Sequence, residues 1–320
     1  MNLGKRIGVV ATVAAAVFAL TGCAGTNTAA VDNKVTIFGG YGEAQAAAFQ
    51  AELDEFGKAN GITITFKSLA SFDKDIKVKI EAGQAPDIAL WPQPGGLKDT
   101  SSSLLPISDV LTADQLNSIK STLVPGWDSL AVVDGKLYGL PVSANMKTIV
   151  FYNPAEFKKH GYTVPTTDAE LTALEAKIKA DGAGYPWCAG IESGGATGWA
   201  FTDWVEQYVL DYNGSEVYNN WIKGDVKFAG PEVTKAVDEV ATRLLADGHV
   251  NGGGVAMAAD SFGDTAPLFD MGGKAAGECF MLRQGSFITG FFPDAIKAEL
   301  AAGNYAHADV FPLPAPEGAQ

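Results

Sequence analysis

The chemistry that this sequence offers most clearly is that of tryptophan side chains placed in loops. Several of the six tryptophans lie in glycine- and proline-rich stretches rather than on helix faces. An indole face suits the apolar C–H face of a sugar ring, and nearby amides, carboxylates and guanidinium groups can bind sugar hydroxyls. Trp91 follows a short apolar strand, so we expect it in a binding site. Trp204 and Trp221, in or near helices, are expected in the core, and both interpretations stay open for Trp127 and Trp199.

Motifs of the common enzyme classes do not occur in this sequence. The segment from Gly40 to Gln45 lies between a strand and a helix, as a dinucleotide-binding loop would, but Gln45 replaces the third glycine. There is no nucleophile elbow and no zinc-protease motif. The three histidines, His160, His249 and His307, are far apart, so we expect no metal site and no cofactor. A glycosidase carboxylate pair is defined by separation in space, which a sequence does not show.

The N-terminus has the pattern of an export signal. Two basic residues precede an apolar run from Ile7 to Leu20, which is shorter than the about 20 residues of a membrane span. The Leu-Thr-Gly-Cys sequence ending at Cys23 resembles the bacterial lipobox, in which the cysteine becomes the lipidated first residue. An ordinary signal with an accidental cysteine is the alternative. We predict a signal peptide over 1–22, a lipidated tether over 23–33 and anchoring to the outer face of the bacterial cell membrane.

Charge and cysteine content agree with export. The formal net charge of −14 argues against nucleic acid and anionic membrane surfaces as partners. If Cys23 is acylated, Cys188 and Cys279 remain, and an oxidising compartment permits them to form a disulfide. Two free buried cysteines are the alternative. Without its signal, the 320-residue chain is still longer than one core usually serves, so we expect two domains.

Strand and helix patterns alternate from the start of the mature chain. Residues 34–38, 61–69 and 87–91 read as strands with helical patterns between them. This βαβαβ order predicts a parallel sheet with helices on its faces. Capping signals predict helix starts after Thr112, Asn153 and Thr167. A long extended stretch and two further helices are expected over residues 138–152, 202–212 and 231–246.

Several motifs, taken in order, resemble the extracellular solute-binding proteins of ABC-type sugar importers. Beside the lipobox and the βαβαβ unit, they are Ala85–Ile88, Tyr138–Pro141 running into Val150–Asn153, Gly273–Ala276 and Gln284–Phe287. Those most similar to the alpha-glucoside branch are Cys188–Gly194, Thr197–Trp199 and Thr202–Trp204. The resemblance covers nearly the whole mature chain.

The resemblance implies a two-lobed α/β fold of the periplasmic-binding-protein type (type II), with parallel-rich sheets and hinge strands between the lobes. Lobe 1 would comprise residues 34–141, and lobe 2 with the hinge strands would comprise residues 142–282. Residues 283–320 would return to lobe 1. Members of the family usually continue well past the strand at Pro314, so the C-terminus is expected to be incomplete.

The resemblance also implies capture of a solute without catalysis. A sugar, an alpha-glucoside or short oligosaccharide, would bind between the lobes of a monomer and pass to ABC permease subunits. A lipid-anchored glycoside hydrolase and a surface polysaccharide-binding adhesin are the alternatives. Ligand-binding residues implied by position are Tyr41, Glu43, Trp91, Gln93, Asn145, Lys147, Glu192, Trp199, Asp203 and Arg283. For Lys147 and Arg283, a role as surface charges stays equally open.

Overall fold

The computed structural model describes residues 33–69, 71–269 and 279–320. The chain divides into two compact units, one ending at Ser143 and the other beginning at Ala144. The predicted signal peptide, Cys23 and nearly all of the tether lie outside the described residues. Over the described ranges, no helix combines the length and hydrophobicity needed to cross a bilayer.

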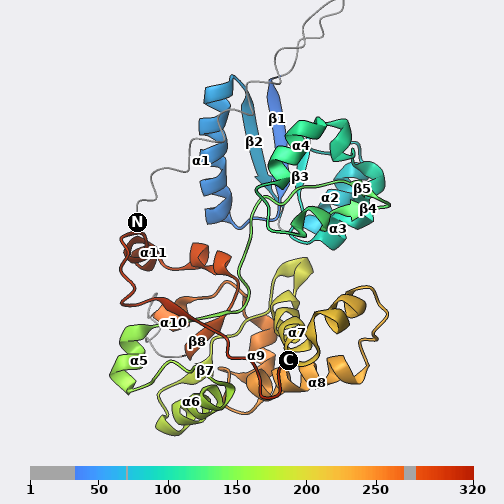
Figure 1. Cartoon of the computed structure of the whole chain (residues 1–320). Coiled ribbons are helices and arrows are strands. Elements are labelled where there is room, and N and C mark those ends of the chain that lie inside the picture. The colour runs from blue at the N-terminus through green and yellow to red at the C-terminus, as the bar shows by residue number, and fades with distance from the viewer. Residues whose placement is uncertain (1–32, 70, 270–278) are drawn as a thin grey trace, which may run out of the picture. The chain divides into compact units, whose positions relative to one another are not determined.

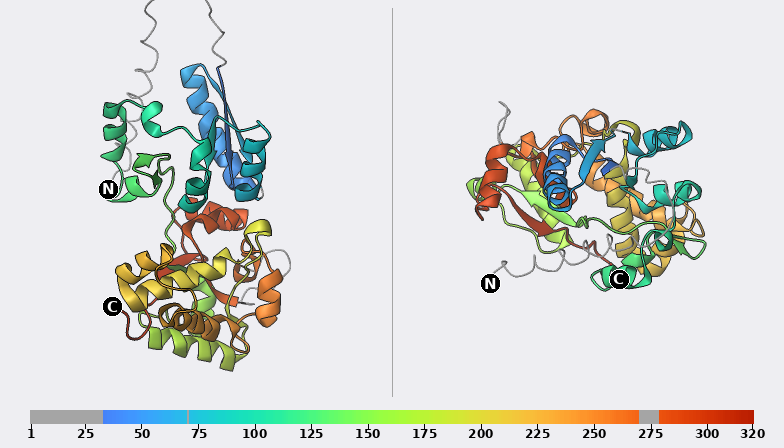
Figure 2. Two further views of the ribbon diagram at one scale, coloured as in Figure 1. Left: turned by 90° about the vertical axis from the view of Figure 1, so that its right-hand side faces the viewer. Right: turned by 90° about the horizontal axis from the view of Figure 1, so that it is seen from above.

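The first unit is built on a three-stranded parallel sheet. Its elements follow in the order β1 (Lys34–Gly39), α1 (Glu43–Asn60), β2 (Thr63–Ser68), α2 (Phe72–Glu81) and β3 (Ile88–Leu90). The strand order is β2-β1-β3, with both pairings parallel, which confirms the predicted βαβαβ unit (Figure 1). Because the crossover from β1 to β2 and the crossover from β2 to β3 run in opposite directions across the sheet, right-handed connections place α1 and α2 on opposite faces (Figure 2).

Short helices and a hairpin complete the first unit. They are α3 (Pro94–Thr100), η3 (Ser101–Ser103), η4 (Ile107–Asp109), α4 (Ala113–Lys120), η5 (Trp127–Ser129), β4 (Val132–Val133) and β5 (Lys136–Leu137). Thr112 and Gln115 form the predicted capping box, with each side chain bonded to the backbone of the other residue. The predicted extended stretch over 138–152 is largely irregular, since only its last four residues form a strand.

The second unit is built on a four-stranded mixed sheet. Its strand order is β7 (Tyr185–Trp187), β8 (Cys279–Arg283), β6 (Ile149–Tyr152) and β9 (Asp309–Pro312). Strand β6 pairs antiparallel with both β8 and β9, whereas β7 and β8 are parallel. The sequence analysis expects residues 283–320 in lobe 1, but the structure places β9 in this sheet. The reason is the register of β9 with β6, which pairs Phe311 with the buried Val150.

Helices surround the sheet of the second unit. They are α5 (Pro154–His160), α6 (Asp168–Asp181), η6 (Gly194–Ala196), α7 (Trp199–Ile222), α8 (Pro231–Val240), η7 (Ala241–Leu245), α9 (Gly253–Ala259), α10 (Ala266–Phe269), η8 (Ser286–Phe291) and α11 (Asp294–Ala301). Asn153 caps α5 and Thr167 caps α6, as predicted. The predicted helix over 231–246 changes to a π-helix at Ala241. Helix α7 extends past the predicted 202–212, with a kink at Gly214.

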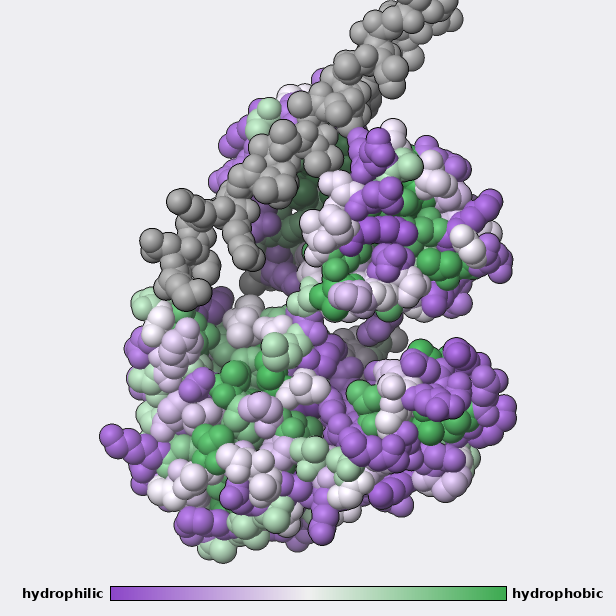
Figure 3. Space-filling view, in the orientation of Figure 1, coloured by the Kyte–Doolittle hydropathy of each residue, from purple (hydrophilic) through white to green (hydrophobic). Residues whose placement is uncertain are grey.

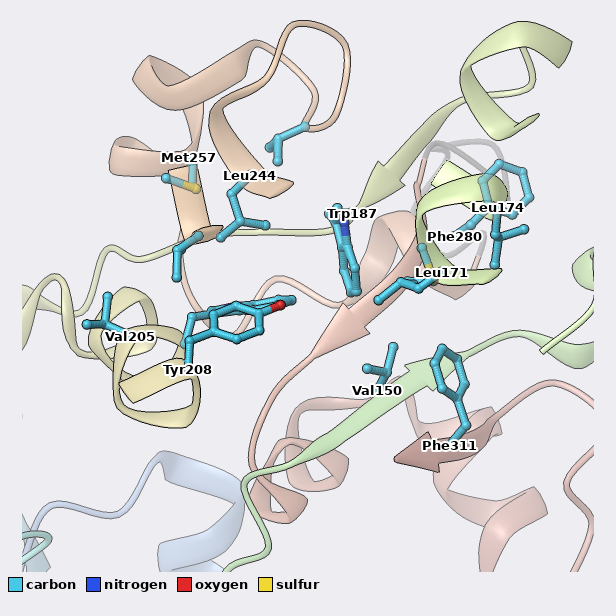
Figure 4. Packing of buried hydrophobic residues seen from close by; sticks show 14 of the residues in the cluster. Val150, Leu171, Leu174, Trp187, Val205, Tyr208, Leu244, Met257, Phe280 and Phe311 are labelled. Atoms are coloured by element: carbon cyan, nitrogen blue, oxygen red, sulfur yellow. The ribbon is translucent and has the colours of Figure 1, made fainter. Parts of the chain in front are cut away.

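The core of the second unit gathers aromatic rings from its strands and from α7. Trp187 of β7 is 1% exposed and meets Trp204 of α7 edge to face, with ring centroids 5.0 Å apart. Figure 4 shows Trp187 between the leucines of α6 and the side chains of Tyr208 and Leu244. Trp204 is 4% exposed, which confirms its predicted place in the core. On the visible face of each unit, hydrophobic residues are interspersed with hydrophilic ones (Figure 3).

Candidate functional site

Two predicted binding loops of the first unit leave the same edge of its sheet. Gly39, the last residue of β1, pairs with Leu90, the last residue of β3. Tyr41 and Trp91 follow these ends directly, at the carboxyl edge where parallel α/β sheets bind ligands. The two loops therefore leave the sheet side by side, and their contact with a ligand stays a prediction.

The aromatic side chains of these loops also pack within the unit. Tyr41 meets Phe49 and Phe66, with ring centroids 5.5 and 5.4 Å apart. Trp91 is partly buried and meets Phe72 edge to face at 5.7 Å. Its indole Nε1 is buried and has no hydrogen-bond partner among the described residues. The indole of Trp91 thus contributes to the core as well as to the loop surface.

Two further predicted residues of the first unit lie at helix starts. Glu43 is the first residue of α1, and its side chain lies outside the described part of the structure. Gln93 holds the cap position of α3, and its side chain is exposed. Whether either residue contacts a ligand stays a prediction.

The second unit brings three of the predicted residues into direct contact. Gly198, in the left-handed conformation with φ of 104°, ends the preceding turn, so that α7 begins at Trp199. Trp199 and Asp203 are four residues apart and share a helix face. The Nζ of Lys147 lies 2.6 Å from Asp203 Oδ2 and 4.7 Å from the Trp199 ring centroid. An ammonium group over an indole face is attracted by the ring quadrupole.

Two phenylalanines that the sequence analysis did not name as site residues join this cluster. Phe287 lies 5.7 Å from Trp199 and 5.4 Å from the Nζ of Lys147, and Phe262 lies 5.1 Å from Trp199, measured to ring centroids. Phe287 belongs to the Gln284–Phe287 motif, and this motif is the sequence signal that could have identified Phe287 as a site residue. Gly285 makes the contact possible, because a Cβ there would lie 2.4 Å from the Phe287 ring.

Arg283 lies behind this cluster and is 6% exposed, so it is not a surface charge. Its Nη2 donates to the backbone carbonyl of Asp203 at 2.9 Å, and its guanidinium carbon lies 5.1 Å from the Trp204 ring centroid. Burial lowers the pKa of Arg283, an effect opposed chiefly by the nearby carboxylate of Asp203. A guanidinium group nonetheless stays protonated at neutral pH.

Glu206 and Asp211 lie about one and two turns after Asp203 along α7, and both act on the charge of Arg283. Burial raises the pKa of Glu206, although the hydroxyl of Tyr218 donates to its carboxylate at 3.0 Å. Burial also raises the pKa of Asp211, which accepts a hydrogen bond from Gln207. These carboxyl groups therefore hold their protons more tightly than exposed ones would.

The remaining predicted residues of the second unit lie at the edges of the cluster. Ser286 Oγ donates to Asn145 Oδ1 at 3.3 Å, which ties Asn145 to the segment that carries Phe287. Glu192 accepts a hydrogen bond from the backbone of Gly194 at 2.7 Å, so its carboxylate stabilises the turn before α7. The structure thus assigns Glu192 a local role, and any contact with ligand stays a prediction.

A disulfide joins the residue that follows β7 to the first residue of β8. Cys188 and Cys279 are bonded, with an S–S distance of 2.03 Å, as the sequence analysis predicts. Cys188 and Arg283 line one recess of the unit, together with Gly190 and Trp204. Within the described ranges, no three side chains of the metal-ligating types gather closely enough to hold an ion.

The sequence is similar to those of two curated binding proteins. The chain is 32% identical over 310 residues to the osmoprotective compounds-binding protein GgtB of Synechocystis sp., a match that covers 95% of this chain and 70% of GgtB. It is 35% identical over 268 residues to the alpha-glucosides-binding periplasmic protein AglE of Rhizobium meliloti. That match covers 81% of this chain, which spans only 57% of AglE.

Solved structures confirm the predicted fold class. The GacH receptor of Streptomyces glaucescens, solved unliganded and with acarbose, matches with a TM-score of 0.61 at 20% identity. The match covers 90% of this chain and 67% of GacH. The profile of the bacterial extracellular solute-binding proteins matches residues 39–320. With this match and the identity to GgtB and AglE, the chain belongs to the family of bacterial extracellular solute-binding proteins.

Proposed function

We propose that this chain captures an uncharged sugar outside the cell and delivers it unaltered to an ABC permease. An alpha-glucoside or short oligosaccharide is the proposed ligand, and the chain would act as a monomer tethered by lipid on Cys23. Support for the sugar comes from AglE, named for alpha-glucosides, and from GacH, solved with acarbose. Support for export comes from the family and from the signal pattern before Cys23.

One observation in the structure carries this proposal. Trp199 and Phe287 present ring faces beside Lys147 and Asp203, whose side chains are 36% and 12% exposed. Ring faces suit the C–H faces of a pyranose, while the ammonium donates to hydroxyl groups and the carboxylate accepts from them. Neighbouring aromatic and charged groups of this kind recognise a polyhydroxylated ring without any nucleophile or metal.

The test is a calorimetric titration of the full chain with maltose, trehalose, sucrose and raffinose. We expect one or more of these sugars to bind with micromolar or tighter affinity and to be recovered intact. Release of monosaccharides would overturn the proposal in favour of a hydrolase. Binding to polysaccharide with no response to any short sugar would overturn it in favour of an adhesin.

A matched pair of variants assigns the site. Trp199→Ala should weaken sugar binding by at least about tenfold, since aromatic anchors often contribute more than 1.4 kcal/mol. Phe228→Ala removes an aromatic side chain of the same unit that is 63% exposed, and it should leave the affinity unchanged. Equal affinities of the two variants would remove Trp199 from the site.

The tether and delivery proposals have separate tests. Mass spectrometry of the chain purified from bacterial membranes should find diacylglycerol on Cys23, and Cys23→Ala should release the protein from the membrane fraction. Sugar-loaded protein should stimulate ATP hydrolysis by the reconstituted transporter. A membrane-bound Cys23→Ala protein, or a transporter that does not respond, would contradict the respective proposal.

A further inference from the structure

The recess beside Arg283 contains a hydrogen-bond donor that the protein itself does not use. Arg283 Nε is fully buried and has no acceptor among the described residues. The same side chain is anchored at its other end by the bond from Nη2 to the Asp203 carbonyl. Leaving a buried donor without a partner destabilises a protein, and more so when the group is charged. An acceptor from outside the chain would remove this cost.

The recess is of the size and chemistry that one small polar group requires. It admits groups of the size of a water molecule or a hydroxyl. Much of its lining is apolar or glycine, from the residues Cys188, Ala189, Gly190, Ile191, Phe201 and Leu244. Trp204 also lines it and faces the guanidinium group of Arg283. Arg283 and Gln284 are the polar side chains of the lining, and Gln284 Oε1 already accepts a hydrogen bond from the backbone of Gly285 at 3.1 Å. The guanidinium is therefore the charged donor that would hold an incoming oxygen atom.

The charges around Arg283 decide between a neutral and an anionic acceptor. Asp203, Glu206 and Asp211 all act on the charge of Arg283. On the positive side, Lys147 already forms an ion pair with Asp203. Three acidic groups therefore face two basic ones, and a further carboxylate or phosphate would meet repulsion at close range. Like charges brought together at an interface weaken binding.

We propose that the recess takes one uncharged hydroxyl group of the ligand, which accepts a hydrogen bond from Arg283 Nε. The inference rests on the proposed sugar-binding function and makes it more specific: the ligand is a neutral glycoside or polyol glycoside, and sugars carrying a carboxylate or phosphate on the inserted end are rejected. The surrounding carboxyl groups of Asp203 and Glu206 cause the rejection.

The experiment uses deoxy and carboxylate analogues of the neutral sugar that binds best. In the wild-type protein, replacing one particular hydroxyl by hydrogen should weaken binding at least about tenfold, because a buried donor is then left unpaired. Oxidising the primary alcohol at that end of the sugar to a carboxylate should weaken binding by a similar factor. In Arg283→Met, the parent sugar should bind more weakly, and the penalty for the deoxy analogue should disappear.

Two further variants sharpen the test. Glu206→Gln should reduce the penalty for the carboxylate analogue, because one repelling charge is gone. Lys235→Met removes an ammonium of α8 that lies 3.6 Å from the ring centroid of Tyr212 of α7, and neither residue lines the recess. This variant should bind all analogues as the wild type does.

Each outcome separates the inference from the proposed function. Equal deoxy penalties in the wild type and in Arg283→Met, or tighter binding of the carboxylate analogue, would overturn the recess proposal while sugar binding stands. That result would leave a buried water molecule as the partner of Arg283. If no neutral sugar binds the wild-type protein, the proposed function fails and the inference fails with it. If Arg283→Met does not fold, the carboxylate analogue still tests the inference on the wild-type protein, because tighter binding of that analogue would overturn it.

Discussion

The second unit buries two arginines whose surroundings differ in one respect. Arg243, in the π-helix η7, is 3% exposed and is paired with Asp168, with Glu239 at 3.1 Å and with Glu175 at 3.3 Å. The indole Nε1 of Trp187 also donates to Glu175, at 2.8 Å. Arg283 has comparable burial, yet its Nε has no partner in the described structure and a recess lies beside it.

The difference separates a structural charge from one that is available to a ligand. A buried guanidinium whose three nitrogens each donate to a carboxylate holds elements together, as Arg243 holds α6, α8 and η7. A buried guanidinium with a free donor has been desolvated without full compensation, which a protein tolerates where a ligand completes the bonding. If this distinction is correct, stability should depend mainly on Arg243 and ligand affinity mainly on Arg283.

Arg243→Met should give the largest effect on stability. The variant leaves Asp168, Glu175 and Glu239 facing one another without a counter-charge, and removing one partner of a buried ion pair typically costs about 3–5 kcal/mol. The measurement is urea unfolding of the second unit followed by tryptophan fluorescence. A loss below about 1 kcal/mol would show that the cluster does not stabilise the unit.

Arg283→Met is the matched control for that prediction. It removes a guanidinium of similar burial whose bonding is incomplete, and its apolar replacement has no unsatisfied donor. We expect a smaller loss of stability than in Arg243→Met, together with the weaker sugar binding predicted above. If both variants lose the same stability, the proposed distinction between the two arginines is wrong.

Removal of the disulfide should rank second. Cys188 and Cys279 are separated by 91 residues, and a native disulfide closing a loop of this length typically contributes about 2–4 kcal/mol. The double variant Cys188→Ala, Cys279→Ala should unfold at lower urea than the oxidised wild type. Its sugar affinity should fall as well, because Cys188 lines the recess beside Arg283. Unchanged stability after reduction of the wild type would contradict the prediction.

Gly285→Ala should give a moderate effect that is concentrated on binding. Its Cβ would lie 2.4 Å from Phe287 Cε1 and 3.2 Å from Lys147 Cδ, so both site residues would have to move. Overpacking of this kind costs about 1–3 kcal/mol, and we expect several-fold weaker sugar binding. Gly290→Ala is the control: Gly290 lies in η8, the helix that Gly285 precedes, and a Cβ there would meet open space, so the variant should resemble the wild type. Equal behaviour of the two variants would argue against the contact of Phe287 with Lys147.

The sequence predicts the parts of this molecule that depend on local pattern. The βαβαβ unit follows from alternating periodicities, and the caps at Thr112, Asn153 and Thr167 follow from side chains that bond to nearby backbone. The pairing of Cys188 with Cys279 follows from export and from the number of cysteines. In each case the interaction joins residues that are close in the sequence, or it is predicted by the number of residues of one type.

Sequence reasoning fails where the determining contact is non-local. Strand β8 lies between β6 and β7, and β9 pairs with β6 rather than with a strand of the first unit. The burial of Arg283 follows from this arrangement, so the sequence leaves a surface role equally open. Phe262 joins Trp199 for the same reason, across 62 intervening positions that carry no periodic signal.

The smallest expected effect is a pH dependence shared by the two arginine clusters. Burial raises the pKa of Glu175 above its ordinary value of 4.5, although Arg243 and the Trp187 indole act in the opposite direction. Burial raises the pKa of Glu206 in the same way. The folded protein then binds these protons more tightly than the unfolded chain does. The stability that these protonated carboxyl groups contribute is complete below the ordinary carboxyl pKa. It is lost as the pH rises through the pKa of the folded state.

Glu175→Gln and Glu206→Gln remove these titrations one at a time. As the pH rises from the ordinary carboxyl value towards neutrality, each variant should gain stability relative to the wild type. The gain should be clearer for Glu206→Gln. Ionised Glu175 has Arg243 as a direct partner at 3.3 Å, whereas the hydrogen bond that Glu206 accepts in the described structure comes from the neutral hydroxyl of Tyr218. Urea unfolding across this pH range measures both differences. If the wild type instead gains stability relative to the variants as the pH rises, the pKa values of these carboxyl groups are lowered in the folded protein. Both carboxylates would then be held as ions by their arginines.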